Sequence, residues 1–115
     1  LLRRPINNLD DISKMSEMVR AMVKESLNCF VRGDTELAKR VLAMDDEVDR
    51  MKNKVFKDQM NVMKVSSEDV EACLDIILVA RNLERLGDHA TNIGEDVIFA
   101  FTGKDVRHGG KFAGP

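Results

Sequence analysis

The sequence predicts an all-α protein, folded as an antiparallel up-down-up bundle of three helices. Only two prolines occur among the 115 residues, Pro5 and Pro115, so the interior of the chain can form long helices. Apolar residues recur there at spacings of three and four along three segments, which is the pattern of helices that bury one face. Two short polar turns separate the segments, and such turns place consecutive helices side by side.

The first helix is predicted from about residue 5 to residue 32. Its candidate core residues recur along one helical face: Leu9, Ile12, Met15, Val19, Met22, Val23, Leu27, Phe30 and Val31. Gly33 and Asp34 follow this segment. Glycine suits the left-handed conformation that ends many helices, and an aspartate side chain can accept hydrogen bonds from the first free amides of the next helix.

The second helix is predicted over about residues 35–64 and the third over about residues 67–102. The candidate core of the second helix consists of Leu37, Val41, Met44, Val48, Met51 and Val55. The candidate core of the third consists of Ile76, Val79, Leu83, Leu86, Ala90, Ile93, Val97 and Ala100. Ser66, with Asp69 three positions later, forms a variant of the capping box and predicts the start of the third helix, and Gly103 predicts its end.

Residues 1–103 are therefore predicted to form one domain, followed by a flexible tail over residues 104–115. The tail has three further glycines and almost no apolar pattern. Its Lys104, Arg107, His108 and Lys111 form a weak basic cluster, which is either a solvated end or a docking patch. Because the first residue is Leu1 and not methionine, the chain can be a piece of a longer protein.

The composition argues against several classes of partner. Eighteen basic and 20 acidic residues give a net charge of −2, so the overall charge does not favour nucleic acid or an anionic membrane. No segment approaches the roughly 20 consecutive apolar residues of a membrane span. We therefore expect a cytoplasmic protein without nucleic-acid partners and without direct membrane insertion. Cys29 and Cys73 lack the spacing of a zinc site or a disulfide framework, and are predicted to be small core residues.

The third helix carries acids on one line beside its apolar face. At about 100° per residue, Glu84, Asp88 and Glu95 fall within roughly 40° of one another, with Asn92 at the edge of that arc. The second helix has a similar pair, Asp45 and Asp49, beside its own apolar seam. Two antiparallel helices that each place a carboxylate pair beside their shared seam can bring four carboxylates together.

Such a group of acids needs a compensating cation, because like charges four residues apart on a helix repel. Carboxylates suit Mg²⁺, Mn²⁺, Fe or Zn²⁺, so one interpretation is a metal site. The other is that nearby basic side chains neutralise the acids as ordinary ion pairs, the candidates being Arg50, Lys52, Arg81 and Arg85. The spacing alone leaves both open.

The same helix contains two glycines, Gly87 and Gly94, at positions where glycine costs around 1 kcal/mol relative to alanine. Together with Ala80 and Thr91 they lower the relief of the helix beside the acids. This pattern predicts either tight packing of helices within the bundle or a partner-binding surface formed by Ala80, Gly87, Thr91 and Gly94.

Two segments carry a family resemblance. Residues 80–97, ARNLERLGDHATNIGEDV, resemble the signature helix of the PhoU family of bacterial phosphate-transport regulators. Residues 43–49, AMDDEVD, resemble the companion motif, and residues 103–108 are similar to the end of many members. The similarity is strong over about residues 37–108. It implies a single three-helix PhoU unit, most like the second of the two bundles that the family's usual protein has in tandem.

The resemblance also implies a site. Some members bind metal clusters on the bundle surface through acid-x-x-x-Asp pairs, which here are Asp45 with Asp49 and Glu84 with Asp88. Asn92 and Glu95 extend the second motif as accessory ligands. The identity of the metal, Fe, Zn, Mn or Mg, stays open, because such sites select cations by geometry and availability more than by residue type.

The function implied is a non-enzymatic negative regulator of the phosphate-starvation response. Family members connect the ATPase of a phosphate ABC transporter with a sensor histidine kinase, which would bring this cytoplasmic protein to the inner membrane through its partners. We expect a homo-oligomer such as a dimer, or a second PhoU-like bundle, as a further partner. The alternative is a metal-free helical dimerisation or interaction module. A dimetal oxidase is disfavoured, since neither His89 nor His108 has a glutamate three residues before it.

Overall fold

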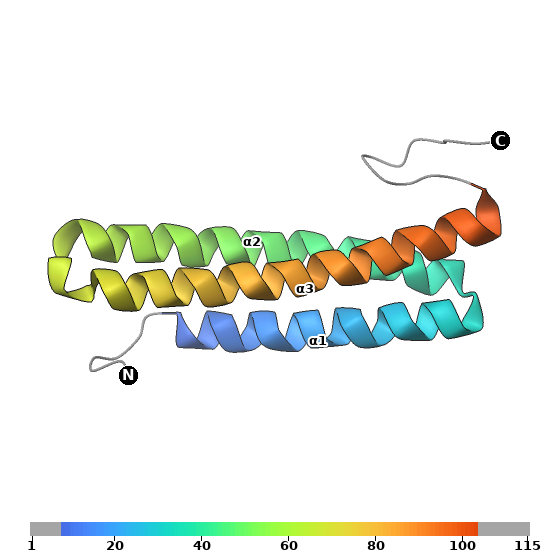
Figure 1. Ribbon diagram of the computed structural model, residues 1–115, viewed down its shortest axis with the longest axis horizontal. Helices are drawn as coiled ribbons and strands as arrows, with labels where there is room; N and C mark the ends of the chain where they lie inside the picture. Colours follow the sequence, from blue (N-terminus) through green and yellow to red (C-terminus); the bar gives the residue numbers. More distant parts are fainter. Residues whose placement is uncertain (1–7, 104–115) are drawn as a thin grey trace.

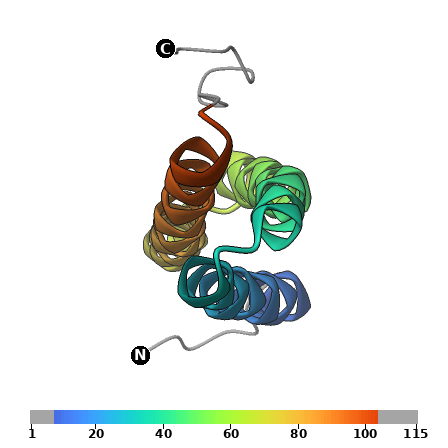
Figure 2. The same ribbon diagram turned by 90° about the vertical axis from the view of Figure 1, so that its right-hand side faces the viewer.

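The computed structural model describes residues 8–103, which form three long antiparallel α-helices (Figure 1). Helix α1 spans Leu9–Arg32, α2 spans Thr35–Val65 and α3 spans Val70–Thr102, and a short 3₁₀ helix, η1 (Ser67–Asp69), precedes α3. Seen end on, the helices lie at the corners of a triangle, and each contacts the other two (Figure 2). The predicted all-α up-down-up bundle is confirmed, while the predicted tail, residues 104–115, lies outside the described residues.

The turn between α1 and α2 forms as its two residues predict. Gly33 adopts a left-handed conformation with φ 63°, and the side chain of Asp34 accepts a hydrogen bond of 3.0 Å from the backbone N–H of Leu37. The ring of Phe101, near the end of α3, covers this turn. A Cβ atom at Gly33 would lie 2.7 Å from Cζ of Phe101, the end of an exposed side chain that can move aside, so glycine is favoured here mainly by its left-handed conformation.

The turn between α2 and α3 differs from the prediction. The hydroxyl of Ser66 donates a hydrogen bond of 2.8 Å to the carboxylate of Asp69, and Ser66 makes no side-chain capping bond to the helix backbone. The chain passes through η1 before α3 begins at Val70, three residues later than predicted. The predicted capping box is therefore wrong. The side chains of Ser66 and Asp69 bond to each other and not to backbone amides at the start of the helix, where the chain forms a 3₁₀ turn.

Helix α1 begins at Leu9, later than the predicted start near Pro5. Asn8 precedes it in the left-handed region, with φ 72°, a conformation that asparagine tolerates better than most residues. Its side-chain amide donates to Asp11 at 2.7 Å and to Asp58 of α2 at 2.8 Å. The side chain of Gln59 donates back to its oxygen at 2.6 Å. These bonds tie the start of α1 to the far end of α2.

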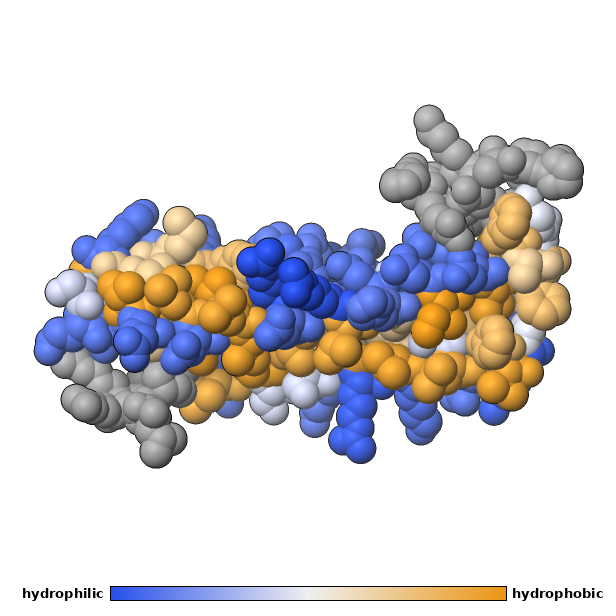
Figure 3. Space-filling model, viewed as in Figure 1, coloured by the Kyte–Doolittle hydropathy of each residue, from blue (hydrophilic) through white to orange (hydrophobic). Residues whose placement is uncertain are grey.

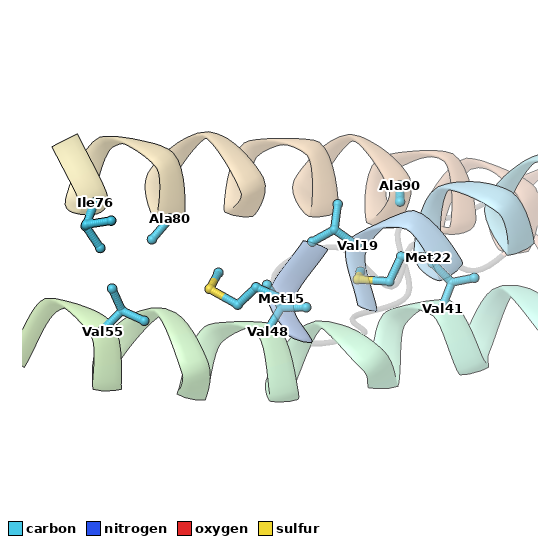
Figure 4. Packing of buried hydrophobic residues seen from close by; sticks show 9 residues of the cluster. All are labelled: Met15, Val19, Met22, Val41, Val48, Val55, Ile76, Ala80 and Ala90. Atoms are coloured by element: carbon cyan, nitrogen blue, oxygen red, sulfur yellow. The ribbon is translucent and has the colours of Figure 1, made fainter. Parts of the chain in front are cut away.

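The main core lies along the axis of the bundle, where side chains of all three helices meet (Figure 4). Its buried members are Met15, Val19, Met22, Val41, Val48, Val55, Ile76, Ala80 and Ala90. A second cluster at the end that holds the α1–α2 turn consists of Cys29, Leu37, Ala38, Val97 and Ile98. Both cysteines are buried and free, as predicted.

Several predicted core residues are exposed instead: Leu9, Leu27, Phe30 and Val31 on α1, and Val79, Leu86 and Ala100 on α3. Both helices carry a second apolar stripe beside the buried one. On α3 the buried stripe includes Ala80, Gly87 and Gly94, because small residues let the helices approach closely, and the larger Val79 and Leu86 are left on its flank. The predicted core of α3 is therefore right at Ile76, Ala90 and Val97, which are buried, and wrong at the exposed Val79, Leu86 and Ala100.

Candidate functional site

Four carboxylates of α2 and α3 lie along the seam between these helices, and we call them the acidic edge: Asp45, Asp49, Glu84 and Asp88. Two observations join the pairs across the seam. Lys52 of α2 bonds to both Asp49 and Glu84. The negative charges of Asp88 and Glu84 on α3 raise the pKa of Asp45 on α2, which requires that these carboxylates lie near one another. The helices thus bring together both pairs of acids that the sequence singled out.

Lys52 is the central cation of this edge. Its Nζ lies 2.7 Å from Oε2 of Glu84 and 3.1 Å from Oδ1 of Asp49, and only 18% of its side chain is exposed. The same Nζ lies 5.8 Å from the centre of the Phe56 ring, within reach of a cation–π contact. The hydrogen bond to Glu84 raises the pKa of Lys52, and the bond from Lys52 lowers the pKa of Asp49. Both groups are therefore charged at neutral pH.

Asp45 is in the least favourable position of the four. It is half-buried, and its Oδ1 lies 3.7 Å from the place that a Cβ atom of Gly87 would take. Burial raises its pKa, and the negative charges of Asp88, Asp49 and Glu84 raise it further. The ionised carboxylate of Asp45 is thus disfavoured where it stands.

The small residues of α3 serve the packing of the bundle. Ala80, Gly87 and Gly94 are buried, which favours the alternative of tight helix packing, while the partner-binding surface stays a prediction. A Cβ at Gly94 would lie 3.2 Å from the carbonyl oxygen of Ala38, so α2 and α3 approach each other closely there. Thr91 is partly exposed, and its hydroxyl donates to the carbonyl oxygen of Asp88.

The two accessory residues continue α3 beyond the acidic edge. Asn92 follows Asp88 by about one turn and is exposed, while Glu95 follows by about two turns and is half-buried. The charges that raise the pKa of Asp45 are those of the other three acids of the acidic edge and of Asp46, and Glu95 is not among them. The structure therefore gathers four of the six predicted ligands and leaves the other two further along the helix.

A metal ion does not fit this arrangement as it stands. Carboxylates are suitable donors for Mg²⁺, Mn²⁺, Fe or Zn²⁺. Yet among residues 8–103 no three histidine, cysteine, aspartate or glutamate side chains converge closely enough to hold one ion. Lys52 lies between Asp49 and Glu84, where an ion would have to draw them together. The metal site remains a prediction.

The other interpretation is that basic side chains neutralise the acidic edge. Of the four basic residues considered for this role, only Lys52 forms ion pairs with these acids. Lys52 pairs with the acidic edge, whereas Arg50 pairs with Glu47 on the outer side of α2. In the described part of the chain, no ion pair joins Arg81 or Arg85 to these acids. A single lysine therefore faces four carboxylates.

Comparison with known proteins identifies the family. A family model described as PhoU domain matches residues 12–97, which is most of the chain and includes the whole acidic edge. The chain belongs to the PhoU family. This confirms the resemblance carried by the motifs around Asp45 and Glu84. No solved structure matches the chain.

Several relatives are named phosphate-specific transport system accessory protein PhoU homolog. The relative from Caulobacter vibrioides is 36% identical over 95 residues, which cover 83% of this chain and 41% of the relative. That from Zymomonas mobilis is 41% identical over 92 residues, covering 80% and 39%. That from Pseudomonas aeruginosa is 38% identical over 98 residues, covering 85% and 40%. This PhoU chain thus spans about two fifths of the length of these relatives.

The PhoU bundle has a second distinctive surface, on the opposite flank of α3. Leu27 and Phe30 of α1 are 52% and 67% exposed, and Val79 and Leu86 of α3 are 43% and 49% exposed. We call these four residues the apolar edge. Leu86 is about 160° around α3 from Glu84, with the buried face between them, so the apolar edge lies on the α1 side. Figure 3 shows apolar surface running along this face of the bundle.

Sequence reasoning missed a polar cluster at the start of α1. Lys54 of α2 bonds to Asp11 at 2.8 Å and to Asp58 at 3.0 Å, and Asn8 bonds to the same two carboxylates. We call this group the end cluster. Its members on α1 and α2 are up to 50 residues apart in the sequence, and only the spacing of Lys54 and Asp58 hinted at a contact. None of the described helices is long and apolar enough to cross a membrane.

Proposed function

We propose that this PhoU domain is a non-enzymatic regulator of phosphate uptake and of the response to phosphate starvation. The observation that carries the proposal is the match of the PhoU domain to residues 12–97, together with relatives named as accessory proteins of a phosphate-specific transport system. An accessory protein acts through contacts with other components. Its partners here are the ATPase of a phosphate ABC transporter and a sensor histidine kinase, on the cytoplasmic side of the membrane.

The apolar edge supports this adaptor role. Large apolar side chains exposed on one flank are typical of protein interaction surfaces. Between Val79 and Ala100 the same stripe of α3 continues through Leu86 and Ile93. The occupant we propose is a second PhoU-like bundle, from another copy of this chain or from a longer protein. The relatives are more than twice as long as the segment they share with this chain, so they have room for one.

Complementation tests the regulatory role. The chain would be expressed in a bacterium that lacks its own PhoU protein, and a starvation-induced phosphatase would be assayed in phosphate-rich medium. We expect the chain to restore repression, and failure to do so at normal protein levels would contradict the proposal. Leu86→Asp should abolish repression, because it places a charge in the apolar edge. Leu74→Asp is the matched control, since Leu74 is equally exposed (48% against 49%) on another face of α3.

We also propose that the acidic edge binds a divalent metal ion that organises the surface around it. The carboxylate chemistry of Asp45, Asp49, Glu84 and Asp88 supports this, as does the unfavourable charge of Asp45, which a metal ion would relieve; these side chains would have to move to converge on one ion. A bound ion would supply positive charge to the acidic edge. The second candidate, a metal-free interaction module, is favoured by one observation, which is that Lys52 already neutralises part of the edge.

A further inference from the structure

We propose that the end of the bundle that holds the α1–α2 turn binds an anionic lipid surface. We call this end the apolar tip and define it by three exposed side chains, Val31 of α1 and Phe99 and Phe101 of α3. The inference goes beyond the proposed function, because it involves neither the apolar edge nor the acidic edge. Contact with lipid headgroups needs no membrane-spanning helix, and the described helices include none that could cross a membrane.

The apolar tip exposes large apolar side chains that neither core cluster includes. Val31 is 81% exposed, Phe101 is 62% exposed and Phe99 is 45% exposed. Val31 lies two residues before Gly33, and the ring of Phe101 covers Gly33, so α1 and α3 both contribute to this end. Figure 3 shows apolar side chains gathered there, where α3 ends in Figure 1. Exposed apolar patches mark sites of contact with proteins or membranes.

The size of the tip favours a lipid surface over a second protein. The bundle is a rod 55 Å long with a cross-section of 23 × 16 Å. Its end therefore presents roughly half of the ~800 Å² that each partner buries in a standard protein interface. The larger area lies along the side of the rod, where the apolar edge is. A lipid surface needs no large matching area, since its headgroups rearrange around the few side chains that enter them.

The charge of this end is complementary to anionic lipid. Residues 31–40 and 99–115, which contain the tip, have six basic and three acidic residues and a net charge of +3. The whole chain has a net charge of −2, so its remaining residues carry −5. Two of the three acids are engaged within the bundle, because Asp34 caps α2 and Glu36 pairs with Lys39 at 3.2 Å. The overall charge does not favour an anionic membrane, but the charge around the tip does.

Vesicle sedimentation of the full chain tests the proposal. The vesicles contain equal parts of phosphatidylcholine and phosphatidylglycerol, and pure phosphatidylcholine vesicles are the comparison. We expect the chain to bind the anionic vesicles, and the double variant Val31→Ser/Phe99→Ser to bind them about 10-fold more weakly, because two apolar side chains no longer enter the lipid.

Val65→Ser/Leu74→Ser is the matched control. Val65 and Leu74 are 85% and 48% exposed, close to the values of Val31 and Phe99, and they lie at the opposite end of the bundle, beside the α2–α3 turn. This control should bind the anionic vesicles as the original chain does.

Two further measurements separate the apolar and the electrostatic contributions. The sequence contains no tryptophan, so Phe99→Trp introduces a single fluorescent reporter. Its emission should shift to shorter wavelength on anionic vesicles, whereas that of Leu74→Trp should not, and this test holds even if the double serine variant does not fold. Replacement of Lys104, Arg107 and Lys111 by glutamine should abolish the preference for anionic over pure phosphatidylcholine vesicles.

Three outcomes would overturn the proposal. The first is equal vesicle binding by the two double serine variants, and the second is no binding of the original chain to either kind of vesicle. The third is self-association without lipid that is lost in Val31→Ser/Phe99→Ser, which would assign the tip to a second copy of this chain. None of them bears on the proposed function, which Leu86→Asp tests at the apolar edge.

Discussion

Two lysines of α2, two residues apart, each bridge a pair of carboxylates, and the two clusters are balanced differently. In the end cluster, Lys54 and Asn8 both bond to Asp11 and Asp58, so two acids share one cation and one amide. In the acidic edge, Lys52 faces four acids and bonds to two of them.

The pKa values follow this difference. Hydrogen bonds from Lys54 and Asn8 lower the pKa of Asp11 and of Asp58, so both carboxylates are stabilised as charged groups. In the acidic edge, burial and the neighbouring acids raise the pKa of Asp45 instead. The bonds of the end cluster stabilise its two carboxylates in their charged form. In the acidic edge the negative charge of Asp45 opposes the stability of the fold. Residues that oppose stability in this way are typical of functional sites.

The largest expected effect is a difference in the free energy of unfolding between a variant of Lys52 and a variant of Lys54. In the presence of a chelator, Lys52→Met should lower the free energy of unfolding by about 1.5 kcal/mol, because a largely buried charge-assisted bond between helices is lost and four acids then repel without a cation. Lys54→Met should cost clearly less, since its ion pairs are exposed to solvent. Thermal and urea denaturation of both variants would measure this. Equal losses would remove the distinction between the clusters.

A smaller effect should appear in the pH dependence of stability. The pKa values of Asp11 and Asp58 in the folded state lie below the ordinary aspartate value of 3.8, so the folded state binds fewer protons than the unfolded state in that range. Their contribution is therefore present above pH 3.8 and is lost as the pH falls through the lowered values. Lys54→Met should flatten this acid-induced loss. Urea unfolding between pH 7 and pH 3 would test it, and an unchanged slope would contradict the role of Lys54.

The sequence predicted the helices and both acidic pairs because those features are local. Helical spacing places Asp45 with Asp49 and Glu84 with Asp88, and the turn residues Gly33 and Asp34 act through their own backbone. The family resemblance added the identity of the domain, which the match over residues 12–97 confirms.

Features that depend on distance between helices could not be predicted in the same way. Apolar residues on α3 lie both in the core and on its flank, and which of them are buried depends on how closely the helices approach at small residues such as Gly94, where a Cβ would lie 3.2 Å from the carbonyl oxygen of Ala38. Likewise, four basic residues were candidates for neutralising the acids, and only the register of α2 against α3 selects Lys52. Contacts within one helix follow from its sequence, whereas contacts across a seam follow from the packing of two.

The smallest expected effect concerns the acid that Lys52 does not hold. Asp45→Asn should raise the free energy of unfolding at pH 7 by a few tenths of a kcal/mol, the usual scale of repulsion between like charges four residues apart. Because the folded state raises the pKa of Asp45, its contribution to stability is complete below pH 3.8 and is lost as the pH rises through the raised value.

The gain from Asp45→Asn should therefore shrink as the pH is lowered, since a protonated aspartate and an asparagine are then alike in charge. This direction is opposite to that of the end cluster, where stability is lost in acid. Asp75→Asn is the control, since Asp75 is exposed to solvent on α3 and is not among the charges that raise the pKa of Asp45. A loss of stability in Asp45→Asn at pH 7 would mean that the charge of Asp45 stabilises the fold. The contrast between the end cluster, which stabilises the fold, and the acidic edge, which opposes its stability at Asp45, would then be wrong.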